Sequence, residues 1–183
     1  RARITERLGA TMADPRAFSL IAIHGNHIPV DFPADAIAEA EAAAPVTTVK
    51  GREDLREVPL VTIDGADARD FDDAVWAEPD PDHAGGWHAM VAIADVAHYV
   101  TTDRPLDRAA RERGNSVYFP DRVVPMLPEA LSNNLCSLVP HQPRPCLAVH
   151  MWIGGDGKLH RHRFLRGLMR SAARLTYEQV QSA

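Results

Sequence analysis

The sequence predicts an α+β protein with a mixed, mainly antiparallel sheet and flanking helices. Beyond residue 58, apolar runs of strand length alternate with segments rich in Pro, Gly and Asp, as is typical of strands joined by turns. Only 6% of the residues are aromatic and fourteen are proline, which favours a loop-rich mixed fold over a helical bundle. With 183 residues, 45% of them hydrophobic and 25% charged, the chain can form one core of good size.

Residues 1–32 are predicted to form short strands and turns, and a helix is predicted to follow them. Residues 17–23 are apolar enough for a strand or a short helix, and the sequence does not decide between them. Residues 33–44 predict a helix, because a proline stands near its start and acidic residues occupy its early turns. Pro45 ends that helix. The polar segment 46–58 predicts a connection, and we place a domain boundary after residue 50.

Strands dominate the rest of the predicted fold. The segment 87–95 is long and mostly apolar, so we expect it to be central, and the turn-rich residues 79–86 would join it to the strand before it. A helix over 106–113 is closed by Gly114, and Thr176 is a good N-cap for a last helix. The predicted strands are 59–63, 74–78, 87–95, 146–153, 158–165 and 168–173.

The most informative segment is an aspartate-rich run that follows the strand at 59–63. Its five aspartates are Asp64, Asp67, Asp70, Asp72 and Asp73. Carboxylates this close repel one another unless a cation or a proton is shared. Hard oxygen ligands at this density suit Mg²⁺, with Mn²⁺ as an alternative, and two such ions are a common device for cleaving phosphodiesters. The run therefore predicts metal-assisted chemistry.

Two blander interpretations of the run remain open. Aspartate-rich stretches usually form acidic surface loops, but a solvated loop does not need aspartates between two apolar strands with Phe71 in their midst. A structural Ca²⁺ site is the second alternative. It is disfavoured because Gly65 takes the second position of an EF-hand pattern and Val75 stands where the bidentate glutamate should be.

Charge is distributed unevenly along the chain. The formal net charge of −5 argues against a nucleic-acid ligand. Yet residues 53–82 hold eleven acidic side chains against two arginines, whereas residues 157–175 hold six Lys and Arg side chains and no acid. An acidic metal pocket beside a basic track for phosphates would produce this split. For any single arginine, a solvated strand face is the favoured interpretation, so only the run as a whole suggests a phosphate-rich partner.

Several other features have ordinary interpretations. No stretch approaches the roughly 20 apolar residues needed to span a bilayer, and no membrane partner is expected. Cys136 and Cys146 lack metal-type spacing and predict small buried thiols in a reduced, cytoplasmic protein, which we expect to be a monomer. Asp95 is a helper carboxylate or a loop cap, with capping favoured. Histidines without metal-ligand spacing are expected to be structural: His88, His98, His141 and His150.

Several blocks of the chain resemble, in order, the catalytic RNB domain of the ribonuclease II/ribonuclease R family. They comprise the aspartate run with its flanks, at 54–75, and then residues 91–96, 114–120, 125–128, 131–138 and 173–177. The likeness covers roughly residues 51–183, and the ordered spacing of the blocks argues strongly against coincidence. The Gly-Asn-Ser-Val-Tyr-Phe-Pro block resembles the ribonuclease R branch more closely than the ribonuclease II branch.

The resemblance implies a processive, Mg²⁺-dependent exoribonuclease that degrades single-stranded RNA from its 3′ end to nucleoside 5′-monophosphates. The catalytic, metal-holding aspartates of the family match Asp64, Asp70, Asp72 and Asp73. Asp67 is not among them, and we expect Asp72, the central one, to be the least replaceable.

Tyr118 matches the family's aromatic residue that stacks on the base at the 3′ end. An aromatic face binds any base without reading its identity, which suits a non-specific exonuclease. Without the resemblance, Tyr118 and Phe119 would both be interpreted as core aromatics beside Pro120. With it, that interpretation is kept for Phe119 alone.

The resemblance also predicts domain organisation. Residues 3–9 resemble the last strand of the cold-shock, OB-type domain that precedes the catalytic domain, so residues 1–50 are predicted as its tail and a linker helix. Residues 51–183 are predicted as the N-terminal part of the RNB domain. The family's arginine-rich signature and a supporting glutamate are not among these 183 residues. Because cationic groups stabilise phosphoryl-transfer transition states, we expect these residues alone to have very low activity or none. A non-catalytic RNA-binding relative is the main alternative.

Overall fold

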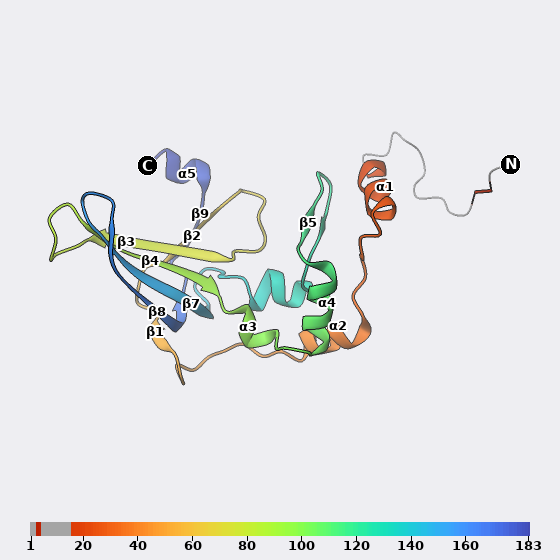
Figure 1. The fold of residues 1–183 in the computed structure, drawn as a ribbon, viewed down its shortest axis with the longest axis horizontal. Coiled ribbons are helices and arrows are strands. Elements are labelled where there is room, and N and C mark those ends of the chain that lie inside the picture. The colour runs from red at the N-terminus through yellow and green to blue at the C-terminus, as the bar shows by residue number, and fades with distance from the viewer. Residues whose placement is uncertain (1–2, 5–15) are drawn as a thin grey trace. The chain divides into compact units, whose positions relative to one another are not determined.

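The computed structural model describes residues 3–4 and 16–183 and shows the expected mixed α+β class (Figure 1). The chain divides into two compact units. One comprises Arg1–Glu41 and Thr101–Pro128, and the other comprises Ala42–Val100 and Glu129–Ala183. The predicted cold-shock strand at 3–9 lies mostly outside the described residues, and the domain boundary after residue 50 stays a prediction. No helix in the described ranges is long and apolar enough to cross a membrane.

In the smaller unit, helices α2 and α4 pack against each other. Helix α1 and a two-stranded ribbon of β5 and β6 belong to the same unit. The elements are α1 (Ala17–Gly25), α2 (Ala34–Glu41), α4 (Pro105–Arg113), β5 (Val117–Tyr118) and β6 (Val123–Val124). Helix α1 decides the open choice at 17–23, and α2 and α4 fulfil the two helix predictions. The Glu39 carboxylate accepts the backbone N–H of Leu106, which satisfies a free donor at the start of α4. Gly114 ends α4 with φ of 77°.

The larger unit contains a seven-stranded sheet in the order β1-β8-β7-β4-β3-β2-β9 within the described residues. Strand β4 is central, as predicted. Pairing is antiparallel except where β1 meets β8 and β2 meets β9. The strands are β1 (Glu53–Leu55), β2 (Val61–Asp64), β3 (Asp73–Pro79), β4 (Trp87–Ala94), β7 (Pro143–Ile153), β8 (Leu159–Arg170) and β9 (Ala173–Thr176).

Two predictions about the strands were wrong. Strand β1 lies in the segment expected to be a mere connection. Residues 158–165 and 168–173 were expected to be separate strands, but β8 runs unbroken from Leu159 to Arg170. Gly167, between the two predicted strands, pairs with both Cys146 and Glu53. A Cβ there would lie 2.6 Å from Leu55 Cδ1 and 3.0 Å from Cys146 Sγ, so glycine allows tight packing at this point rather than a turn.

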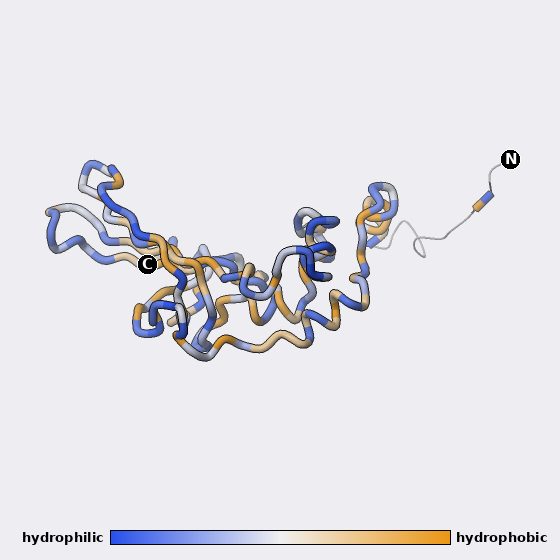
Figure 2. The backbone as a smooth tube through the Cα atoms, turned by 60° about the horizontal axis from the view of Figure 1, so that its bottom comes forward, coloured by the Kyte–Doolittle hydropathy of each residue, from blue (hydrophilic) through white to orange (hydrophobic). Residues whose placement is uncertain are grey.

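The sheet curls until its two edges approach each other. Only two residues separate β8 from β9, although these strands are second and last in the sheet order. The connection is anchored by the N–H of Ala172, which donates to the carbonyl of Leu60 at 2.8 Å. The fully buried side chains of this unit include Leu60, Met90, Cys146 and Met169. Figure 2 shows apolar stretches along the strands and polar tips on the long hairpins.

Short elements complete this unit. They are α3 (Val96–Tyr99), the π-helix η1 (Leu131–Leu135) and α5 (Tyr177–Gln181). Thr176 and Gln179 form a capping box at the start of α5, as the N-cap prediction required. Both cysteines are free and buried. His88 Nε2 and His150 Nδ1 lie 2.8 Å apart and both rings stack on Trp152, which supports a structural role for these two histidines.

Candidate active site

The aspartate run forms a loop that leaves the sheet and re-enters it at the same end. Strand β2 ends at Asp64, and β3 begins at Asp73. The two strands are antiparallel neighbours with Val61 opposite Val75. Because neighbouring antiparallel strands bring the end of one to the start of the next, the carboxylates at both ends of the loop share one end of the sheet.

Phe71 fixes the middle of the aspartate group. Its side chain is 6% exposed. Its N–H donates to Ser137 Oγ at 3.0 Å, and its carbonyl accepts the N–H of Leu138 at 2.8 Å. The next carbonyl, of Asp72, accepts the N–H of Ala94 at 2.9 Å. The backbone that carries Asp70 and Asp72 is therefore anchored on both sides of a buried aromatic ring.

Arg174 of β9 holds the first half of the loop. Its Nη2 donates to the carbonyl of Ala66 at 2.7 Å and, less closely, to that of Gly65 at 3.3 Å. Its guanidinium also lies over the Phe71 ring, 4.7 Å from the centroid. Strand β9 pairs in parallel with β2, with Arg174 opposite Thr62, so the sheet itself sets the position of this side chain. One arginine thus links both halves of the loop.

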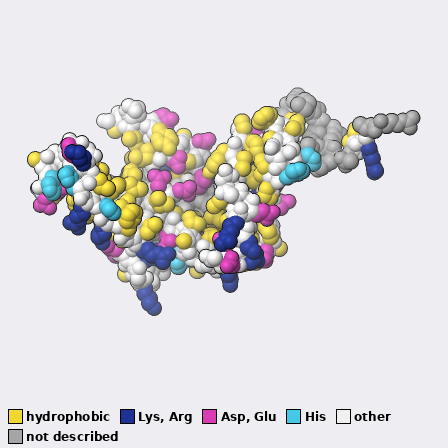
Figure 3. Space-filling view, in the orientation of Figure 1, with side chains coloured by type: hydrophobic (Ala, Val, Ile, Leu, Met, Phe, Trp, Pro, Cys, Tyr) yellow, Lys and Arg dark blue, Asp and Glu magenta, His cyan; other side chains and the backbone are white. Residues whose placement is uncertain are grey.

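Asp72 is the focus of the negative charge. Partial burial raises the pKa of Asp72 to about 6, and the neighbouring charges of Asp70, Asp73 and Asp64 add to the effect. The side chain keeps contact with solvent, so the carboxylate can still exchange its proton or meet a ligand. The structure therefore brings Asp64, Asp70 and Asp73 within electrostatic reach of Asp72, and Asp67 is not among the causes of the shift. Figure 3 shows acidic side chains gathered on this part of the larger unit.

The carboxylate oxygens of the aspartate loop are ligands that suit a hard cation. Ionised carboxylates only accept, and three of them add to the raised pKa of Asp72, a repulsion that a divalent ion would relieve. The side chains have not converged, however. Within the described ranges, no three His, Cys, Asp or Glu residues are grouped closely enough to hold a metal ion. Asp64 Oδ1 instead accepts the N–H of Gly65 at 2.8 Å.

Tyr118 lies on the surface of the smaller unit. It sits in β5, opposite Val123 of β6, and is 65% exposed. A core role is therefore excluded for Tyr118. Phe119 is only partly buried, and its N–H donates to the carbonyl of Arg122 at 2.8 Å.

Asp95 does not cap a helix, which corrects the favoured prediction. It occupies the N-cap position of α3, but its side chain makes no capping hydrogen bond. Instead, Asp95 Oδ2 lies 2.7 Å from Arg52 Nη2, with both side chains almost fully buried. Arg166 Nη2 approaches the other oxygen at 3.5 Å. The signal in the sequence that could have indicated this pair was Arg52, the residue directly before β1.

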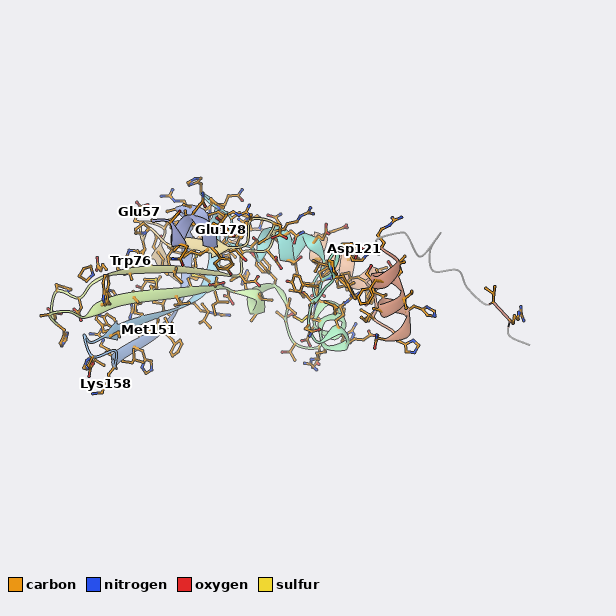
Figure 4. The ribbon with its side chains drawn as sticks, turned by 90° about the horizontal axis from the view of Figure 1, so that it is seen from above. Glu57, Trp76, Asp121, Met151, Lys158 and Glu178 are labelled. Atoms are coloured by element: carbon orange, nitrogen blue, oxygen red, sulfur yellow. The ribbon has the colours of Figure 1, made fainter. Side chains whose placement is uncertain are left out.

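Most arginines of the acid-free run have individual partners. Arg163 forms a two-pronged pair with Glu53, and Arg170 pairs with Glu57. Arg161 lies over Trp152. For these three, local pairing explains the residue without a phosphate ligand. Figure 4 shows Lys158 at the tip of the β7–β8 hairpin, far from α5, where Glu178 lies.

Comparison with known families agrees with this geometry. The model of the RNB domain matches residues 52–183, which include all four aspartates and most of the chain. The chain belongs to the RNB domain family. Ribonuclease R of Vibrio parahaemolyticus is 50% identical over 183 residues, and that of Escherichia coli is 48% identical over 181. These alignments cover 98% and 97% of this chain, but only 22% of each relative. The chain thus spans about a fifth of the length of these curated relatives.

Solved structures show the same fold. Mycoplasma genitalium RNase R in complex with double-stranded RNA has a TM-score of 0.81 and 32% identity, over 87% of this chain and 28% of that one. Yeast Ssd1, described as a pseudonuclease, has a TM-score of 0.66 and 19% identity, over 75% of this chain and 17% of its own. The second likeness concerns the fold alone.

The raised pKa of Asp72 predicts a pH-dependent effect of Asp72→Asn on stability. A pKa of about 6 in the folded protein, against an ordinary value of 3.8, means that folding favours the protonated acid, so stability falls as pH rises between these values. Without metal, the variant should therefore be more stable than the wild type above pH 6, by about 1 kcal/mol after allowance for solvent screening. The difference should fade below pH 4 in urea unfolding. Asp67→Asn, the matched control, should show no such pH dependence, and a difference independent of pH for Asp72→Asn would contradict the assignment.

Replacing Arg174 should destabilise the larger unit. Arg174→Met leaves two loop carbonyls without their charged donor and is expected to lower the free energy of unfolding by about 2 kcal/mol. Arg170→Met is the control, because it removes only an exposed ion pair with Glu57 and should cost less than about 0.5 kcal/mol. Urea unfolding followed by tryptophan fluorescence measures both, since all three tryptophans lie in this unit. Equal losses would refute the special role of Arg174.

Proposed function

We propose that the protein containing this chain is a processive, cytoplasmic 3′→5′ exoribonuclease that hydrolyses single-stranded RNA to nucleoside 5′-monophosphates. The observation that carries the proposal is the anchored group of Asp64, Asp70, Asp72 and Asp73, with the raised pKa of Asp72 at its centre. Membership of the RNB family and 48–50% identity to proteins named ribonuclease R support the reaction class. The complexes of Mycoplasma genitalium RNase R with RNA support RNA as the ligand.

The four aspartates would hold Mg²⁺, or Mn²⁺ as a substitute. When bound, such ions polarise a scissile phosphate, supply an ionised water and stabilise the leaving 3′-oxygen. The chain's own contribution is to keep carboxylates at fixed backbone positions, through Phe71 and Arg174, despite their repulsion. Because side chains must then converge from their present positions, we expect Mg²⁺ to order the group rather than enter a finished site.

Tyr118 would bind the base at the 3′ end. Its exposed ring can stack on any nucleobase, and stacking provides grip without sequence preference. That property suits an enzyme that must accept each newly exposed terminal nucleotide in turn. It also fits a monomer acting on single strands, since no second chain is needed to complete the stack.

A non-catalytic RNA-binding protein is the second candidate. The fold alone does not decide against it, because yeast Ssd1, described as a pseudonuclease, has a similar fold. It is disfavoured by the presence of Asp72 with three further aspartates whose charges add to the burial that raises its pKa. A protein that only bound RNA would have no use for a concentrated negative charge near a polyanion.

The enzyme proposal predicts loss of activity in Asp72→Asn. The full-length wild type should convert labelled single-stranded RNA to short end products in Mg²⁺, and EDTA should stop the reaction. Asp72→Asn should lower the rate at least ~100-fold, because the central metal-binding charge is lost. Asp67→Asn, in the same loop, should retain most of the activity. Failure of the wild type to degrade RNA in Mg²⁺ would favour the binding protein instead.

The stacking role predicts a separable effect at Tyr118. Tyr118→Ala should weaken the binding of single-stranded RNA about tenfold, since a stacked base contributes roughly 1–3 kcal/mol. Tyr118→Phe keeps the ring and should bind like the wild type. Fluorescence anisotropy with EDTA present measures both without degradation of the probe. Equal weakening in the two variants would mean that the hydroxyl, and not the ring face, makes the contact.

A further inference from the structure

A second polar feature of the larger unit lies apart from the aspartate loop. The segment before β1, helix α3 and strand β8 line an open surface cavity of about 500 Å³. This volume is within the usual range for sites that bind small molecules or parts of larger ligands. Its polar lining consists of two threonines, three cationic side chains and a histidine: Thr47, Thr48, Lys50, Arg52, Arg166 and His98.

The charge of this cavity is positive. Lys50, Arg52 and Arg166 contribute three permanent cations. One carboxylate, Asp95, approaches two of them, at 2.7 Å from Arg52 and 3.5 Å from Arg166. The buried ion pair with Asp95 fixes the position of the Arg52 guanidinium. The Arg166 side chain remains 54% exposed and can bind an anion. A guanidinium and an ammonium beside two threonines form a donor set suited to phosphate oxygens.

The sheet register connects this cavity with the aspartates. Arg166 lies opposite Leu147, which lies opposite Ile93, which in turn lies opposite Asp73. Residues directly opposite each other on neighbouring strands share a face, so these four side chains form one row. Three strand spacings of about 4.8 Å separate its ends by roughly 14 Å. Between them, Ile93 and Leu147 are apolar and about half exposed, at 52% and 49%.

We propose that the cavity of Lys50, Arg52 and Arg166 binds a backbone phosphate of the RNA strand upstream of its 3′ end. The strand would cross the row over Ile93 and Leu147, whose apolar surfaces can contact sugars and bases, and reach the aspartates at Asp73. This inference rests on the proposed function for the identity of the ligand. It assigns a phosphate subsite to residues outside the aspartate loop, and it gives a reason for a positive cavity on a chain of net charge −5.

The test measures how RNA binding depends on salt in the full-length protein. A short labelled single-stranded RNA is bound in EDTA, so that it is not degraded, and its affinity is followed by anisotropy from about 50 to 200 mM salt. Each lost phosphate contact lowers the slope of log affinity against log salt by about 0.7 for a single strand. Lys50→Ala with Arg166→Ala removes the contacts to one phosphate and should therefore lower the magnitude of the slope by about 0.7 and weaken binding at low salt at least ~10-fold.

Arg170→Ala is the matched control, because Arg170 is on the same strand and outside the cavity. It should leave both slope and affinity as in the wild type. Circular dichroism must show that the double variant is folded. If it is not, Lys50→Gln with Arg166→Gln, which keeps the length of both chains, replaces it. Arg52 is left intact, since its loss would leave the buried Asp95 carboxylate without its closest partner.

The outcomes separate this subsite from the function itself. An unchanged slope in the double variant overturns the inference. Adenosine 5′-monophosphate is the second probe. If the wild type binds it and the double variant does not, while RNA binding is equal in both, the cavity takes a mononucleotide and the RNA subsite is refuted. If the predicted slopes are found but the wild type fails to degrade RNA in Mg²⁺, the proposed function fails and the subsite stands.

Discussion

Mutual repulsion of four carboxylates at one end of a sheet is the constraint around which the larger unit is organised. Nothing in an acidic loop alone would hold Asp64, Asp70, Asp72 and Asp73 together, because ionised carboxylates separate in water. The structure opposes this with a buried aromatic ring, three backbone hydrogen bonds near it and an arginine from a distant strand. Partial burial, together with the remaining repulsion from Asp70, Asp73 and Asp64, raises the pKa of Asp72.

The curvature of the sheet makes this arrangement possible. Strand β8 leads into β9 after two residues, yet β9 pairs with β2 at the opposite edge. Closure therefore brings Arg174 beside the loop that follows β2. The same closure requires tight packing where β1, β7 and β8 meet, and Gly167 provides the space for Leu55 and Cys146 there. Fold and site are linked through the β8–β9 connection.

Local signals allowed much of this structure to be predicted, and non-local ones account for the errors. Apolar runs placed β2, β3 and β4, and Thr176 placed the start of α5, since each depends on nearby residues. The unbroken β8 could not be foreseen, because the contacts of Gly167 come from residues far away in the chain. Asp95 was misjudged for the same reason: its partner Arg52 is 43 positions earlier. The aspartates were recognised by family resemblance, but the clamp by Arg174 is visible only in three dimensions.

The most direct test of this account is an NMR titration of the Asp72 carboxyl in the folded protein, with and without Mg²⁺. Without metal, the account predicts a pKa of about 6, produced by burial and by the charges of the neighbouring aspartates. With saturating Mg²⁺, a bound cation should favour the ionised form and lower this pKa markedly. An ordinary pKa without metal, or one that Mg²⁺ leaves unchanged, would contradict the claim that these carboxylates form one strained site for a divalent ion.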